Sequence, residues 1–169
     1  MRSTVLRVAQ ILAPPGVEVI LYEGLGVLPH FNPDLDGDES PQLVLELRSE
    51  VGLADGLLIS SPEYAHGVPG SLKNALDWLV ASVEFPNKAV ALLNTSPRAT
   101  HALAQLTEIL TTMSARLIPE ASLTLALPLP IPPSAGLASD PEFSRKINAA
   151  LSAFVRAIRL DQKTVRGFG

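Results

Sequence analysis

Two kinds of hydrophobic pattern alternate along this chain of 169 residues. Short, almost continuous apolar runs end in loops rich in glycine, proline or polar residues, which is typical of strands buried on both faces of a parallel sheet. Between them lie segments whose apolar residues recur every three or four positions, as on one face of an amphipathic helix. The pattern therefore predicts an α/β fold in which a parallel sheet is covered by helices on both faces.

The apolar runs predict strands at 17–22, 55–60 and 87–93, and a last strand between 117 and 127. The first run is rich in β-branched residues, which favour strands. Proline removes the N–H that a ladder needs, so the last strand ends before the proline-rich stretch 128–133, which we expect to be extended.

Helical periodicity predicts five helices. They lie at 3–13, from 40 past 51, at 69–80, at 99–114 and from 140 to 158. Ser40 and Asp140 each precede a proline, so we expect each to cap its helix, with the proline at the first helical position. Residues 23–39 are expected to form a loop, and residues 160–169 a tail.

Composition limits the possible functions. The chain is long enough for one domain, predicted here as 1–169, with no internal repeat and no second domain. Hydrophobic residues make up 47% and charged residues 18%, which describes a globular protein. A formal charge of −4 gives no basic face for nucleic acid, so we expect no such partner.

Several other classes of protein are disfavoured by residue type. The absence of cysteine excludes disulfides, thiolate metal sites and cysteine nucleophiles. His30, His66 and His101 are too scattered along the sequence to suggest zinc, and we expect no metal. The apolar runs are too short to span a bilayer, and the first residues do not have the pattern of a signal peptide. We therefore expect a cytoplasmic protein without a membrane partner.

The most informative segment is 61–79, SPEYAHGVPGSLKNALDWL. It follows the apolar run 56–60, turns through prolines and glycines, and opens into an amphipathic helix. Ligands of open α/β sheets bind at loops that follow the carboxyl ends of strands. This loop carries an aromatic ring, a carboxylate and several backbone amides, which suit a flat polar heterocycle.

The segment resembles the flavin-binding loop of the NADPH-dependent FMN reductase family, whose fold is flavodoxin-like. The resemblance rests on the Pro-Glu-Tyr turn at 62–64 and on Pro-Gly-x-Leu-Lys-Asn-Ala-Leu-Asp-Trp at 69–78, with the spacing intact. It implies that the ring of FMN rests on Pro62, Glu63, Tyr64, Ala65 and His66. An asparagine often follows the tyrosine in that family, and here Ala65 does.

A second loop, which holds Ser96, Pro97 and Arg98, is implied to face the flavin as well. The family's version is commonly rich in glycine, and this one is not. Arg98 would stabilise an anionic reduced flavin or contact a phosphate of NADPH. The alternative, an arginine that is simply solvated at a helix start, stays open.

The resemblance implies hydride transfer from NADPH or NADH to FMN, and onward to a small-molecule acceptor. A quinone, an azo compound, a metal oxyanion or free flavin could each be that acceptor. The flavin carries this chemistry, so we nominate no catalytic side chain. The family also implies a homodimer or homotetramer. Other roles stay open for the motif residues, because Lys73 and Asp77 could simply pair across one helix face and Trp78 could be core or a subunit contact.

The family's opening strand and phosphate-binding loop have no counterpart here, because the sequence opens within the first helix. Ser3 is the candidate phosphate contact that remains, with a plain helix cap as the alternative. We expect a phosphate site that is absent or a remnant. We also expect 17–21 to pair directly with 57–60 in place of the missing strand, although another chain could cover the gap, or the natural protein could be longer.

The alternative function is a flavodoxin-like oligomer that is not an enzyme and has lost FMN with its phosphate loop. A fold by itself does not establish an activity. The colour of the purified protein discriminates between the two, because a flavoprotein is yellow or becomes yellow when FMN is added.

Overall fold

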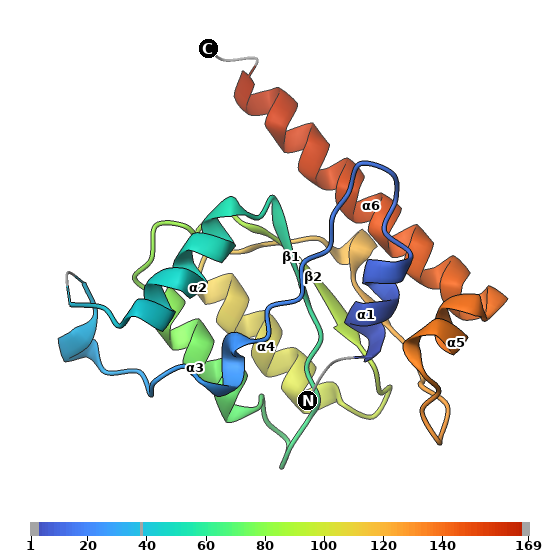
Figure 1. The fold of residues 1–169 in the computed structure, drawn as a ribbon, viewed down its shortest axis with the longest axis horizontal. Coiled ribbons are helices and arrows are strands. Elements are labelled where there is room, and N and C mark those ends of the chain that lie inside the picture. Colours follow the sequence, from blue (N-terminus) through green and yellow to red (C-terminus); the bar gives the residue numbers. More distant parts are fainter. Residues whose placement is uncertain (1–3, 38, 167–169) are drawn as a thin grey trace.

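The computed structural model describes residues 4–37 and 39–166. A small parallel sheet lies between two groups of helices, with α2, α3 and α4 on one face and α1, α5 and α6 on the other (Figure 1). The sheet is formed by β1 (Gly56–Ile59), β2 (Ala89–Asn94), β3 (Arg116–Leu117) and β4 (Leu123–Thr124). Every pairing is parallel, and β2 is central because it pairs with each of the other strands. The predicted α/β fold, a parallel sheet covered by helices on both faces, is confirmed.

The strand β2 explains how the two halves of the core are separated. All its residues are buried. Val90 and Leu92 pack with α2 (Gln42–Leu53), α3 (Gly70–Leu79) and α4 (Thr100–Thr112). Leu93 faces the opposite layer, with α1 (Thr4–Ile11), α5 (Ser134–Ser139) and α6 (Pro141–Arg166). Neighbouring side chains of a strand point to opposite faces, so an apolar run is required where both faces are covered.

The last predicted strand is present in two short pieces. Between β3 and β4 the chain forms a 3-10 turn, η3 (Pro119–Ala121), because Pro119 cannot donate to the ladder. The stretch 128–133, which was expected to be extended, forms no helix or strand and bends at Leu129 and Pro130, and α5 was not predicted.

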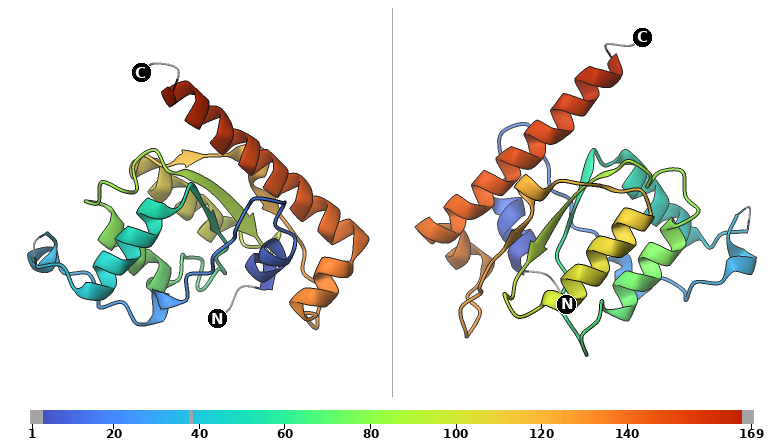
Figure 2. Two further views of the ribbon diagram at one scale, coloured as in Figure 1. Left: turned by 45° about the horizontal axis from the view of Figure 1, so that its top comes forward. Right: turned by 180° about the vertical axis from the view of Figure 1, so that it is seen from behind.

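The last helix begins as predicted, with Asp140 Oδ1 accepting a hydrogen bond of 2.7 Å from the Phe143 N–H. Residues 160–166 of the predicted tail are helical, because α6 continues to Arg166 and projects past the rest of the molecule (Figure 2).

The strand predicted at 17–22 is wrong. Residues 17–22 are extended but belong to no strand, and no backbone hydrogen bond among the described residues joins them to β1. Pairing between 17–21 and 57–60 is therefore wrong too. The segment is held by side chains instead, since Gln10 Nε2 donates to the Val19 carbonyl at 2.8 Å. Its far end meets α2, where burial raises the pKa of Tyr22 and the carboxylates of Glu46 and Glu50 raise it further.

A long loop follows, with 3-10 turns η1 (Gly24–Gly26) and η2 (Pro33–Leu35). Ser40 does not cap α2 as predicted, because its hydroxyl accepts hydrogen bonds from the Gly37 N–H and from Arg48. Arg48 also donates to Asp36 at 2.5 Å and to the Trp78 carbonyl at 2.7 Å. Its half-buried guanidinium thereby ties the loop to both α2 and α3.

Candidate functional site

The candidate site lies where β1 and β2 end side by side. The register Ile59↔Leu92 brings the loop after β1 next to the loop after β2. In parallel sheets this edge is where ligands bind. The loop after β1 contains the predicted flavin contacts Pro62, Glu63, Tyr64, Ala65 and His66.

The loop after β1 forms a tight hairpin turn. The Tyr64 N–H donates to the Gly67 carbonyl at 3.1 Å, and the Gly67 N–H donates back at 2.9 Å. Between them, Ala65 has φ 48° and His66 has φ 60°. Positive φ at both central residues is the pattern of a type I′ turn, which glycine and asparagine favour. Two ordinary L-residues in this conformation cost about 1–3 kcal/mol each, and such strain tends to concentrate at functional sites.

The turn exposes polar backbone to solvent. The N–H groups of Ala65 and His66 make no hydrogen bond within the described part of the chain. Both residues are exposed, and Tyr64 beside them is 56% exposed. Adjacent free donors next to an exposed aromatic ring can meet the polar edge and the flat face of a heterocycle.

The loop is fixed to the start of α4 by side chains. The Ala102 N–H donates to Glu63 Oε2 at 2.9 Å, and the Val68 N–H donates to Gln105 Oε1 at 3.3 Å. The rings of His66 and His101 stack, with centroids 4.3 Å apart and planes 7° from parallel. The predicted site residue Glu63 therefore faces a helix terminus in this structure.

The second predicted loop is organised by Asn94, a buried side chain at the end of β2. Its amide donates to the Ser96 carbonyl at 2.9 Å and accepts from the Ser96 N–H at 3.3 Å. Ser96 Oγ in turn accepts a hydrogen bond of 3.3 Å from the Arg98 N–H. Pro97 and Arg98 are exposed, and the guanidinium makes no hydrogen bond within the described residues. This leaves a cation on the same edge of the sheet as the turn.

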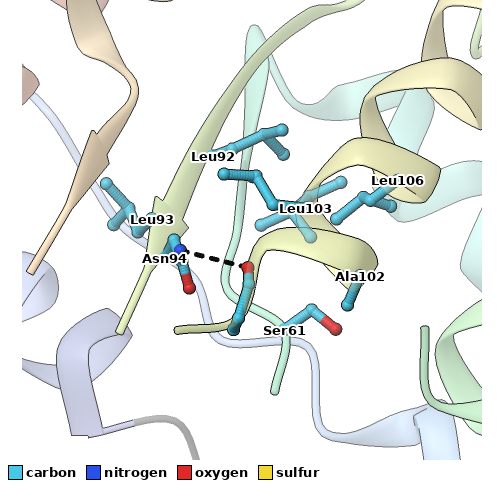
Figure 3. Close-up of a pocket in the computed structure, with 9 residues that line it drawn as sticks. Ser61, Leu92, Leu93, Asn94, Ala102, Leu103 and Leu106 are labelled. Atoms are coloured by element: carbon cyan, nitrogen blue, oxygen red, sulfur yellow. Dashed lines mark hydrogen bonds between the residues drawn. The ribbon is translucent and has the colours of Figure 1, made fainter. Parts of the chain in front are cut away.

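A small pocket lies behind the loop, between the sheet and α4 (Figure 3). Ser61 comes from the β1 side, Asn94 from β2, and Leu103 and Leu106 from α4. Asn94 donates across it to the Ala99 carbonyl at 3.5 Å. The residues that line this pocket are mostly apolar. The N–H groups of Ala65 and His66 lie outside it, on the exposed turn.

The motif helix α3 supports the fold instead of lining the site. Trp78 is fully buried, and its indole N–H donates to the Pro29 carbonyl at 2.9 Å. Asn74 donates to the same carbonyl and accepts from the Phe31 N–H at 2.8 Å. Lys73 pairs with Asp77 on the helix surface. The core interpretation of Trp78 therefore holds for the isolated chain.

One predicted site residue, Ser3, lies outside the described residues, and some partners of the two loops were not predicted. His101, Gln105 and Asn94 were not predicted as site residues. His101 lies one helical turn before Gln105, on the same side of α4, and this spacing could have indicated the two helix residues.

Two negative observations complete the description. None of the helices in the described part of the chain combines the length and apolar character that a bilayer crossing needs. Among residues 4–37 and 39–166, no group of three or more histidine or acidic side chains is placed to hold a metal ion.

The fold and the loops at its carboxyl edge define a flavodoxin-like protein. The chain belongs to the NADPH-dependent FMN reductase family, whose profile matches residues 2–127. The match includes the site loops and ends before α5 and α6, so those helices lie outside the part of the chain that defines the family.

Individual relatives agree with this family. The chain is 36% identical over 96 residues to an NAD(P)H-dependent FMN reductase of Pseudomonas aeruginosa, covering 56% of this chain and 51% of that protein. It is 39% identical over 69 residues to a quinone reductase of Escherichia coli, covering 40% and 37%. The chain thus spans about half or less of the length of these relatives.

Among solved structures, the flavoenzyme NAD(P)H:(acceptor) oxidoreductase FerB of Paracoccus denitrificans superposes with a TM-score of 0.77. It shares 30% identity, over 92% of this chain and 88% of the other. RosB, solved with a bound flavin-type intermediate, superposes with a TM-score of 0.67 over 96% of this chain and 75% of the other, at 16% identity, and supports the fold alone.

Proposed function

We propose that the protein is a flavin-dependent NAD(P)H oxidoreductase that binds the ring of FMN on the turn at residues 62–67. The observation that carries the proposal is the pair of N–H groups at Ala65 and His66 that have no hydrogen-bond acceptor among the described residues, presented by a strained turn at the carboxyl edge of the sheet. FMN supplies the hydride chemistry when bound. The chain's own contribution is to hold the ring and orient its polar edge.

The residues of this edge fit a flavin in chemical terms. The turn offers the adjacent N–H groups of Ala65 and His66 to the polar edge of the ring, and the exposed residue Tyr64 lies beside them. Arg98 is an exposed cation on the neighbouring loop, suited to negative charge on a reduced flavin or a nucleotide phosphate. NADPH or NADH is the proposed donor. A quinone, an azo compound, a metal oxyanion or free flavin is the proposed acceptor class.

The test begins with the purified protein and added FMN, followed by absorbance and by quenching of flavin fluorescence. We expect saturable binding and FMN-dependent oxidation of NAD(P)H by a quinone. The variant Ala65→Pro should abolish both, because proline removes one N–H and cannot adopt the positive φ found there. Leu53→Ala, at an exposed residue before the other end of β1, is the matched control and should behave like the wild type.

The competing function, an oligomer without a cofactor, has one observation in its favour. In the described residues β1 pairs with β2 on one side only, so its other edge lacks the strand that would flank it in a complete flavodoxin-like sheet. A protein that is colourless after incubation with millimolar FMN and removal of the free flavin would favour this alternative. Light scattering tests the proposed homodimer or homotetramer under either function.

A further inference from the structure

We propose that Glu63 is a positioning residue, whose carboxylate holds the strained turn on the first turn of α4 and does not itself contact the bound ring. The inference rests on the proposed flavin site. It changes the role of one residue that the sequence places among the ring contacts.

The geometry of the carboxylate supports this role. Glu63 Oε2 accepts a hydrogen bond of 2.9 Å from the N–H of Ala102, which is the third residue of α4. Amides in the first turn of a helix have no partner within the helix, and an acceptor from elsewhere satisfies them. The positive end of the helix dipole also favours a carboxylate at this place. The N-cap residue of α4, Ala99, has no side-chain acceptor for these amides, so Glu63 supplies the cap from the loop after β1.

The turn needs such support because its own sequence does not favour it. Ala65 and His66 both adopt positive φ, which neither residue prefers. A strained conformation of this kind persists only when several contacts with the surrounding structure enforce it. The stack of His66 on His101 and the bond from Val68 to Gln105 are the further contacts with α4. Together with Glu63, they attach both flanks and the tip of the turn to one helix.

The consequence concerns the free donors. The N–H groups of Ala65 and His66 can meet a flavin only while the turn is held in this form. A loop free to leave positive φ would spend part of its time with these donors turned elsewhere, and apparent affinity falls with the fraction of protein in the competent state. Glu63 therefore acts on ligand affinity through the backbone of its neighbours.

The experiment compares Glu63→Ala, Glu63→Gln and the wild type in FMN and riboflavin titrations. Loss of a helix cap should weaken binding of both flavins about fivefold to tenfold in Glu63→Ala. Glu63→Gln retains an acceptor oxygen and should stay within about threefold of the wild type. Asp140→Ala is the matched control, because it removes an equivalent cap from α6 on the opposite face and should leave flavin affinity unchanged.

A readout without flavin separates this inference from the proposed function. Amide proton exchange by NMR should be faster at Ala102 and Gly67 in Glu63→Ala than in the wild type, and close to wild type in Glu63→Gln. Equal exchange in all three proteins would overturn the positioning role, as would wild-type flavin affinity in Glu63→Ala. Equal loss of affinity in Glu63→Gln and Glu63→Ala, with exchange at Ala102 in Glu63→Gln close to wild type, would instead show that the charge contacts the ligand. A wild type that binds no flavin, with the exchange difference intact, would reject the proposed function while the attachment of the turn to α4 stands.

Discussion

Two segments, the loop 62–68 after β1 and the stretch 17–22, both adopt conformations that their own sequences do not favour. At the carboxyl end of β1, the loop 62–68 contacts α4 through two hydrogen bonds and a ring stack and adopts a conformation that its residues do not favour. Residues 17–22 have a sequence that favours a strand, yet they form none, and no backbone hydrogen bond among the described residues joins them to β1. In both regions, the tertiary structure decides the conformation against the local sequence preference. A β-branched run becomes a strand only when its backbone forms hydrogen bonds with a neighbouring strand.

The largest expected effect concerns the helix that carries the motif. Trp78→Ala should lower the free energy of unfolding by about 3–5 kcal/mol, because it empties a fully buried site and removes one of the two hydrogen bonds to the Pro29 carbonyl. Urea denaturation measures the change. Trp78→Phe keeps most of the volume and serves as the control, with a loss of about 1–2 kcal/mol. A loss below about 1 kcal/mol in Trp78→Ala would contradict the role of α3 as the support of the loops.

The stacked histidines give a smaller effect that tests the contact between loop and helix. A double-mutant cycle with His66→Ala and His101→Ala should give a coupling energy of about 0.5–1.5 kcal/mol, the range for aromatic pairs. Thermal unfolding of the four proteins at one pH supplies the values. Strict additivity would show that the rings do not interact in solution.

Relief of strain in the turn should stabilise the protein. Ala65→Gly replaces a residue at φ 48° by the one residue that adopts positive φ freely, so we expect a gain of up to about 1 kcal/mol. The same change at Ala104, which is exposed within α4, is the control and should cost about 1 kcal/mol. A destabilising Ala65→Gly would mean that the turn is not strained at this position.

The smallest effect is expected in the stretch 17–22. Ile20 is 69% exposed, so Ile20→Ser should change the free energy of unfolding by less than about 0.5 kcal/mol. A loss of about 2 kcal/mol or more in the isolated protein would show that this residue is covered in solution, as a side chain in a complete sheet would be.

Sequence patterns predicted the fold where the signal is local. The buried run that became β2, the periodic helix α4 and the cap at Asp140 all follow from residues close together in the chain. The motif also located the loop after β1. Its hairpin form was not predictable, because Ala65 and His66 lack the usual turn signature and their conformation depends on α4. The failure at 17–22 has the same origin, since no local pattern reports whether a strand has a neighbour.

The most direct test of the proposed site is an amide NMR titration of the wild-type protein with FMN, repeated with riboflavin. If the ring rests on the turn, the largest shifts should appear at the N–H groups of Ala65 and His66, and riboflavin should reproduce them because it carries the same ring. Saturable FMN binding that leaves both amides unmoved would contradict the account.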